Sequence, residues 1–181
     1  MKTLETKLFS FKELSEESRA RVLENQRESV WGDPDNFTLG ECMDSLKAIA
    51  EACNVQLLDW SAGPDNRNNF VKTNSNLEGN KALASFANCL FENDYARTKH
   101  FKEIEFPGVC GFTGVCFDED LAEEMLGALI EGESLNKAFN RAGDRIQQIC
   151  EDDLQYRTSD EGILEYLDTE AEIYTEAGNE F

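Results

Sequence analysis

The last third of the chain, Asp118 to Phe181, carries most of its negative charge and constrains the fold most strongly. It contains 19 of the 37 acidic residues but only four of the 17 basic ones, a net charge of −15. Such a charge repels nucleic acid and anionic membranes, and it attracts basic molecules over long distances in a salt-dependent way. Apolar residues nevertheless recur through this stretch at three- and four-residue steps, which is typical of amphipathic helices. We therefore predict a folded acidic surface that binds a basic partner.

Length and composition predict one folded domain, or one domain with a helical extension. The chain has 181 residues, of which 40% are hydrophobic, and its twelve Phe supply bulky material for a core. The high charge therefore does not imply disorder, because enough apolar surface is available for burial. We expect an α+β core over residues 1–117 and an acidic helical region over residues 118–181. The second region is expected to pack on the first within the same domain.

The sequence shows neither a secretory signal nor a membrane-spanning segment. The N-terminal stretch MKTLETKLFSF is short and mixed in character, unlike the apolar centre of a signal peptide. No apolar run approaches the ~18 residues needed to cross a bilayer. We expect a soluble cytoplasmic protein with no membrane partner.

Hydrophobic periodicity predicts five to six helices. The clearest runs from Leu39 to Cys53, with Leu46 and Ile49 on its apolar face. The expected helices cover residues 15–28, 38–53, 81–95, 118–130, 134–156 and a short segment after 158. Their expected N-cap residues, chosen by side-chain type and by the capping-box pattern, are Ser15, Thr38, Asp118 and Thr158.

Short runs of strand-forming residues predict a small antiparallel sheet beside the helices, and hence an α+β fold. The expected strands cover residues 6–11, 55–60, 69–73 and 172–175. The second and third flank the turn-forming residues 61–66 and should pair with each other. In the last strand, Ile173 is expected to point inward. Trp60 is expected to close one end of the core, with an exposed aromatic anchor as the alternative.

The glycine-rich segment from Pro107 to Phe117 resembles a phosphate-binding loop only superficially. No Gly-Lys-Ser/Thr sequence follows it, and the next residues, 118–120, are all acidic, which would repel a phosphate. We predict a buried, tightly turned loop or short strand. The one basic cluster, Arg97, Lys99, His100 and Lys102, is expected to pair with the chain's own carboxylates.

The residues that usually carry metal or catalytic chemistry are sparse. His100 is the only histidine, and the separation of Cys110 from Cys116 is not that of a zinc site. The six cysteines are expected to be reduced and mostly buried. No nucleophile, metalloprotease, Walker or dinucleotide motif is present. We expect no cofactor, no metal and no catalytic residue; a hydrolase using carboxylates and Mg²⁺ remains an alternative.

Candidate partner-binding residues are the carboxylates of the acidic third that lie outside its apolar stripe. Three of them, Glu151, Asp152 and Asp153, lie near the C-terminus of the longest predicted helix, where the helix dipole disfavours negative charge. That placement indicates either a binding role or simple solvation. The seven candidates are Glu151, Asp152, Asp153, Asp160, Glu161, Glu165 and Asp168.

Three short segments carry a resemblance to a known group of proteins. Residues 9–27, FSFKELSEESRARVLENQR, resemble the opening of small bacteriophage and prophage proteins that begin with a Phe-x-Glu-Leu-Ser-Glu-Glu-like strand-to-helix element. Residues 58–64, LDWSAGP, look like their next element, and residues 158–161, TSDE, look like their C-terminal end. The shared motifs are structural rather than catalytic.

The resemblance implies a setting in which small acidic proteins inhibit host defence. In size, acidity and lack of catalytic motifs the chain is similar to anti-CRISPR and anti-restriction proteins, several of which mimic the charge of DNA. This implies a phage-encoded protein that covers a basic surface of a CRISPR effector nuclease in the host cytoplasm and does not itself bind nucleic acid. An acidic regulator of a polymerase or transcription factor is the alternative, and the sequence leaves open whether the chain forms a homodimer.

Overall fold

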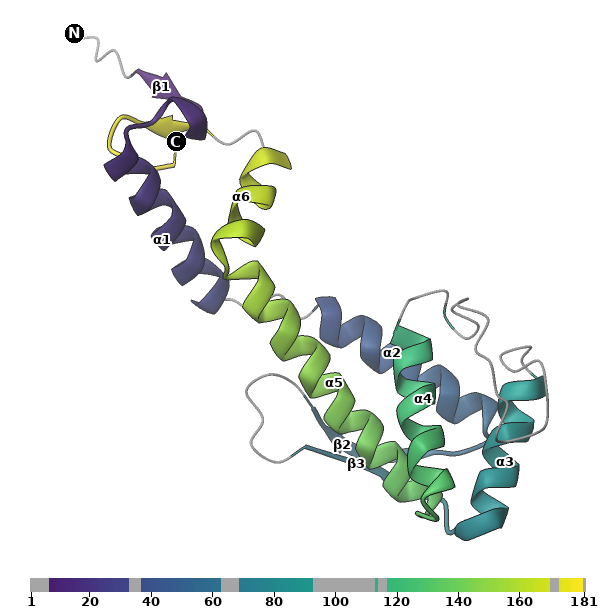
Figure 1. Cartoon of the computed structure of the whole chain (residues 1–181). Helices are drawn as coiled ribbons and strands as arrows, with labels where there is room; N and C mark the ends of the chain where they lie inside the picture. Colours follow the sequence, from purple (N-terminus) through teal and green to yellow (C-terminus); the bar gives the residue numbers. More distant parts are fainter. Residues whose placement is uncertain are drawn as a thin grey trace, which may run out of the picture. The chain divides into compact units, whose positions relative to one another are not determined.

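A computed structural model describes residues 7–32, 37–62, 69–92, 113, 117–169 and 173–180. Within these residues it contains six α-helices and two small antiparallel sheets of two strands each, so the predicted α+β class is confirmed (Figure 1). The chain divides into two compact units. The terminal unit comprises residues 1–35 and 152–181, and the central unit comprises residues 36–151. The division falls within the longest helix, whereas the boundary expected from the sequence, at 117/118, lies inside the central unit.

The terminal unit joins the two ends of the chain. Strand β1 (Leu8–Phe9) pairs antiparallel with β4 (Tyr174–Thr175), and the two lie beside each other in Figure 1. The 3-10 helix η1 (Phe11–Glu13) leads into α1 (Glu16–Gly32), which packs against α6 (Asp160–Thr169). The core of this unit is formed by Leu14, Val22, Ile163, Leu167 and Tyr174, and Phe9 of β1 and Phe11 of η1 are partly buried against it.

Polar contacts fasten the C-terminal turn to α1. The predicted N-cap Ser15 accepts a hydrogen bond from the Ser18 backbone N–H at 3.1 Å, which satisfies one of the helix's unpaired donors. The Ser18 hydroxyl donates in turn to the carbonyl of Glu176 at 2.8 Å, and the Arg21 guanidinium donates to that of Ala177 at 3.0 Å. Residues at opposite ends of the sequence thus belong to one folded unit.

Two predictions for the terminal unit were wrong in register or extent. The first strand covers only Leu8–Phe9, because Phe11 already belongs to the 3-10 helix; residue 6 lies outside the described residues. In the last strand Ile173 is 47% exposed, and its neighbour Tyr174 is the buried residue, at 1%. Successive strand residues point to opposite faces, so a shift of one position exchanges inside and outside.

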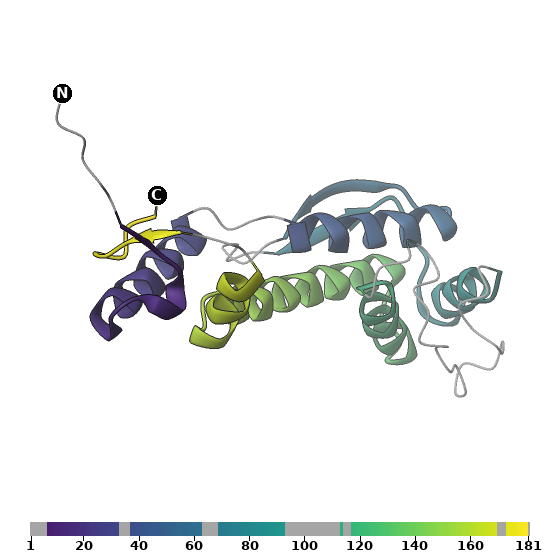
Figure 2. The same ribbon diagram turned by 90° about the horizontal axis from the view of Figure 1, so that it is seen from above.

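The central unit packs four helical segments and a hairpin around a larger core. Its elements are α2 (Phe37–Ala52), β2 (Leu57–Ser61), β3 (Phe70–Thr73), α3 (Gly79–Glu92), α4 (Phe117–Ile130) and residues 135–151 of α5 (Leu135–Arg157). α2 and this part of α5 lie side by side in both views (Figures 1 and 2). Leu46 and Ile49 of α2 are fully buried, as their helical spacing predicted.

The hairpin is held to α5 by a row of side-chain amides. β2 and β3 pair antiparallel, as predicted. The backbone N–H groups of Val71 and Thr73 point away from β2 and donate to the side-chain oxygens of Asn140 and Asn136, at 2.7 and 2.8 Å. Gly143 completes the contact, because a Cβ there would lie 2.8 Å from Val71 Cγ2. α5 thereby covers a sheet edge that would otherwise expose unpaired backbone donors.

Two arginines one turn apart on α5 neutralise the facing side of α4. Arg145 pairs with Asp120 at 2.6 Å and Arg141 pairs with Glu124 at 2.7 Å. Arg141 also reaches Glu131 at 2.6 Å. The pKa of Arg141 is raised, first by its hydrogen bond to Glu124. Asp120, Glu124 and Glu131 are therefore already paired within the chain and are less available to bind a partner.

Several further expectations for the central unit were revised. α2 and α4 begin at Phe37 and Phe117, so the predicted N-caps Thr38 and Asp118 each lie in a first turn. Trp60 is 42% exposed, which favours the alternative of an exposed aromatic over a residue that closes the core. The basic cluster at 97–102 and the glycine-rich segment, Thr113 and Phe117 excepted, lie outside the described residues. The same holds for Cys110, Cys116 and residues 93–95 of the predicted third helix.

Candidate partner-binding surface

A sharp turn between α5 and α6 positions the acidic helix of the terminal unit. Thr158 was predicted to cap α6, but the cap is Ser159, whose Oγ accepts a hydrogen bond from the Gly162 N–H at 3.1 Å. Thr158 instead closes α5, since its hydroxyl donates to the Leu154 carbonyl at 2.8 Å. A Cβ on Gly162 would lie 2.2 Å from the Tyr156 carbonyl oxygen. Only glycine allows the two helices to meet so closely.

The exposed side of α6 combines acidic and apolar side chains. Ile163 and Leu167 face the core, which leaves Glu161, Leu164, Glu165 and Asp168 in solvent. These four residues recur at steps of three and four, so they form one continuous strip. Together with the neighbouring Tyr156 of α5 we call them the α6 face. Leu164 is 42% exposed, at the centre of the strip.

Tyr156 is tied into this strip by its hydroxyl, which donates a hydrogen bond to Glu165. The hydrogen bond is the main reason why the pKa of Tyr156 is raised above its usual value. Partial burial and the negative charges of Glu165 and Glu161 act in the same direction. The phenol ring thus stays neutral beside two carboxylates and presents an apolar surface within an acidic rim, a combination suited to a protein interface.

The structure separates the seven predicted carboxylates into engaged and available groups. Asp153 pairs with Arg157 at 2.9 Å, and Asp160 pairs with Arg27 at 2.5 Å. Arg27 also donates to the Thr158 carbonyl at 3.0 Å, so Asp160 belongs to a contact that joins α1 to α6. Asp153, whose side chain is 30% exposed, is therefore poorly placed to bind a partner, whereas the Asp160 side chain remains 73% exposed despite its ion pair.

The remaining five predicted carboxylates are exposed. Asp168 pairs with Lys12 at 2.7 Å, but both side chains are largely in solvent, where such a pair is weak. Glu151 accepts a hydrogen bond from the Gln147 amide within the central unit. Within the described part of the chain, Asp152 and Glu161 make neither an ion pair nor a hydrogen bond through their side chains.

The expectation that the helix dipole disfavours the carboxylates at 151–153 was wrong. α5 ends at Arg157, so these carboxylates lie a full turn or more before its end, and the dipole effect fades within the last turn. The last turn itself carries the favourable cation Arg157. The three residues also fall on two units, because Glu151 belongs to the central unit and the other two to the terminal unit.

The hairpin carries a second exposed group that the sequence only hinted at. Leu58, Trp60 and Phe70 all expose large apolar side chains on β2 and β3. Trp60 lies beside turn-forming residues in the sequence, and this position was the reason for considering an exposed aromatic side chain as the alternative. This group lies in the central unit, so it is described separately from the α6 face.

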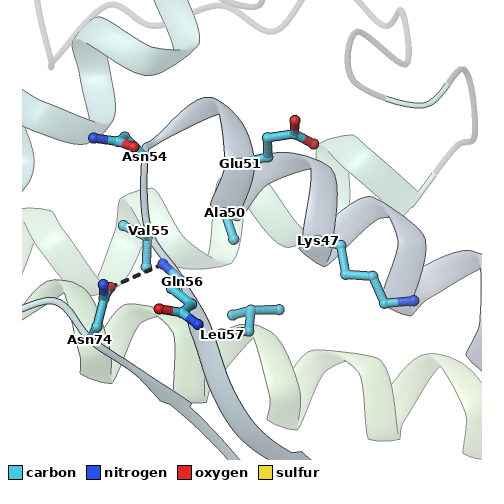
Figure 3. A pocket seen from close by; sticks show the side chains of 8 residues that line it. All are labelled: Lys47, Ala50, Glu51, Asn54, Val55, Gln56, Leu57 and Asn74. Atoms are coloured by element: carbon cyan, nitrogen blue, oxygen red, sulfur yellow. Dashed lines mark hydrogen bonds between the residues drawn. The ribbon is translucent and has the colours of Figure 1, made fainter.

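A shallow pocket of about 530 Å³ opens where α2 ends and β2 begins (Figure 3). Its lining brings together one cation, one carboxylate and three amides, from Lys47, Glu51, Asn54, Gln56 and Asn74. The Gln56 N–H donates to the Asn74 side-chain oxygen at 3.0 Å, while Glu51 and Lys47 point away from this bond in Figure 3. The pocket offers hydrogen-bonding groups to a small polar ligand, without a constellation of reacting groups.

Among the residues that the structure describes, no group of His, Cys, Asp and Glu side chains is arranged to hold a metal ion. None of the described helices combines the length and apolar character needed to cross a membrane. Comparison of the chain with known protein families, curated proteins and solved structures finds no match.

Proposed function

We propose that the protein is a binding protein whose acidic surface occupies a basic, phosphate-binding site on a nucleic-acid-processing partner. The observation that carries this proposal is the concentration of charge in the terminal unit. Its two segments contain 18 acidic and seven basic residues, a formal charge of −11. The central unit, which is longer, has a formal charge of −9. An arginine- and lysine-lined groove would attract the terminal unit most strongly.

The α6 face supplies the contact at which this attraction becomes specific. Carboxylates one turn apart on a helix lie roughly 5–6 Å from each other, whereas successive phosphates of one DNA strand advance by about 3.4 Å along the duplex axis. The match to a phosphate row is therefore approximate. Leu164 and Tyr156 offset this by adding an apolar centre, which nucleic acid backbones lack and which protein interfaces favour.

The resemblance of three segments to small phage proteins supports a more specific form of the proposal. In that form the protein is a phage-encoded inhibitor of a CRISPR effector nuclease, acting in the host cytoplasm by covering the channel that holds DNA. The mechanism is steric and electrostatic and requires no catalysis. A transcription-related partner would use the same surface chemistry, so the identity of the partner is decided by the experiment.

The test is competition with DNA. A fluorescently labelled target duplex is bound to a guide-loaded CRISPR effector nuclease, and its anisotropy is followed as the protein is added. The proposal expects displacement of the duplex, with weaker binding as salt rises from about 50 to 200 mM. Undiminished DNA binding and cleavage at a large excess of the protein, for effectors of each DNA-targeting class, would contradict the CRISPR form of the proposal.

A further inference from the structure

A pocket of about 330 Å³ lies between α1 and α6, entirely within the terminal unit. Ile163 is only 2% exposed and Val30 is half-buried, so these two side chains form an apolar floor. Ser29 and Tyr166 are exposed and lie at the mouth. The complete lining comes from α1, α6 and the last residue of α5: Gln26, Ser29, Val30, Arg157, Gly162, Ile163 and Tyr166. The volume is at the lower limit of ligand pockets, so it suits one large side chain rather than an extended molecule.

The chemistry of the lining favours an aromatic ring over an aliphatic side chain. Tyr166 is 47% exposed and offers a ring against which a second ring can pack. Arg157 contributes a planar guanidinium, a group that stacks on aromatic faces. Its Nε atom donates to Asp153 at 2.9 Å. Because this ion pair balances the charge of the guanidinium, Arg157 does not repel a cationic segment that approaches the pocket.

The surroundings of the pocket favour a basic segment as the carrier of that ring. Three of the lining residues have an exposed glutamate as a sequence neighbour: Glu28, Glu161 and Glu165. The whole terminal unit has a formal charge of −11. A second copy of the chain would bring the same negative charge, whereas lysines and arginines beside the ring would be attracted.

We propose that this pocket receives an aromatic side chain from a basic segment of the partner, next to the α6 face. The inference rests on the proposed function and narrows the partner to proteins with a groove for single-stranded nucleic acid. Such grooves combine cations that hold phosphates with aromatic side chains on which bases stack. The terminal unit would occupy both parts of such a groove, because its carboxylates take the cations and its pocket takes the ring.

The first test uses the full chain and a set of amidated heptapeptides. Each peptide carries Phe, Leu or Ala at its centre, with Lys or Arg at all other positions, and a fourth places Phe among glutamates. Binding is followed through the carbon-13 methyl signals of Val30 and Ile163. We expect the basic Phe peptide to shift both signals and to bind at least about tenfold more tightly than the Ala peptide, since it buries a ring. The Leu peptide should bind more weakly than the Phe peptide, and the acidic peptide should leave both signals unchanged.

Three results would overturn the proposal. The first is equal affinity of the Phe and Ala peptides, or binding that leaves the Val30 and Ile163 signals in place. The second is tighter binding of the Leu peptide, which would make the pocket an aliphatic site. The third is a change of these signals with protein concentration in the absence of peptide, which would assign the pocket to a second copy of the chain.

A pair of variants separates this inference from the proposed function. Ser29→Trp should block the mouth and lower the affinity for the Phe peptide to that for the Ala peptide. Ala20→Trp is the matched control, because residue 20 is also exposed on α1 but lies on the opposite side of the helix. Both variants are then compared with wild type in displacing DNA from the effector nuclease. Equal displacement by all three would overturn the pocket proposal and leave the proposed function standing. If the Phe peptide binds as expected but wild type displaces no DNA, the proposed function fails and the preference of the pocket for an aromatic ring stands. The peptide comparison needs no variant, so it decides the question even if Ser29→Trp does not fold.

Discussion

The Nε atom of Arg157 donates a hydrogen bond to Oδ2 of Asp153 at 2.9 Å, across one turn of α5. This pair distinguishes Asp153 from its neighbour Asp152, which extends into solvent. Reversal of all three charges at 151–153 would therefore combine a structural loss with a change of surface charge. The two effects can be separated by single substitutions.

Asp153→Lys should destabilise the protein, because it removes an ion pair and places two cations one turn apart. Each effect is worth a few tenths of a kcal/mol on a helix surface, for a total below about 1 kcal/mol. Asp152→Lys is the matched control and should leave the melting temperature unchanged within error. Thermal unfolding followed by circular dichroism measures both variants. Equal melting temperatures for the two variants would contradict a stabilising role for the Asp153–Arg157 pair.

Gly162→Ala should lower stability by about 1–3 kcal/mol, the usual cost of overpacking. The added methyl would clash with the Tyr156 carbonyl oxygen, a backbone atom that cannot rotate aside. The control is Gly127→Ala in α4, where a Cβ meets nothing within 4 Å and should stabilise the helix by about 0.5–1 kcal/mol. Denaturant unfolding of both variants gives the comparison. A neutral Gly162→Ala would mean that the turn between α5 and α6 is wider than described.

Asn136→Ala should cost about 1–3 kcal/mol, because it leaves the N–H of Thr73 on β3 without its acceptor. Asn136 Oδ1 also accepts from the Thr73 hydroxyl at 3.0 Å. The control is Asn136→Asp, which keeps an acceptor oxygen in the same position and should cost less. The hydrogen-exchange rate of the Thr73 amide measures the loss of this hydrogen bond directly, and the exchange should be faster in Asn136→Ala. Equal protection in wild type and Asn136→Ala would contradict the amide contact.

Tyr156 should ionise at a higher pH than an ordinary tyrosine, for which the pKa is about 10. Its hydrogen bond to Glu165 favours the protonated phenol in the folded state. The associated stability is therefore present below about pH 10 and is lost as pH rises through the raised pKa. Glu165→Gln should shift the titration to lower pH, as read from the Tyr156 signal of protein labelled with carbon-13 at the tyrosine ring. A titration unchanged by this substitution would exclude Glu165 as the cause.

Helical periodicity predicted most elements, because amphipathic helices carry their packing direction in the spacing of apolar residues. Leu46 and Ile49 are buried as expected for that reason. The end points were less certain, since neighbouring residues such as Thr158 and Ser159 can both cap a helix and the tertiary fold selects one of them. The short last strand was ambiguous in the same way, because Ile173 and Tyr174 are both apolar and two paired residues cannot define a register.

Contacts between distant residues could not be predicted from one sequence. Asn136 and Asn140 resemble any polar pair on a helix, and nothing in their spacing indicates that they accept hydrogen bonds from the backbone of β3. Likewise, the acidic composition indicated which carboxylates could bind a partner. It could not show that Asp160 and Asp153 are already paired with Arg27 and Arg157. The sequence did contain a weak signal for the α6 face. Four of the five residues from 163 to 167 are apolar, and a short helix with one buried side cannot bury all of them, so at least one had to be exposed.

Under the proposed function, the α6 face, rather than acidity in general, binds the partner. The comparison uses two double variants with the same charge change and the same spacing. Glu161→Lys with Glu165→Lys reverses the α6 face, and Glu119→Lys with Glu123→Lys reverses two carboxylates at the same spacing near the start of α4, where Glu119 is half-buried and Glu123 is exposed. Glu161 and Glu119 both lie in the first turn of their helices, so the dipole contribution is matched.

The decisive measurement is the affinity of wild type and both double variants for the guide-loaded effector nuclease, at about 50 and 200 mM salt. Both variants lose the same amount of net charge, so long-range attraction falls equally in the two. We expect the α6 variant to bind at least about tenfold more weakly than the α4 variant, a difference of roughly 1.4 kcal/mol, with a shallower dependence on salt. Equal affinities of the two variants, with a flat salt response in the wild type, would contradict this expectation.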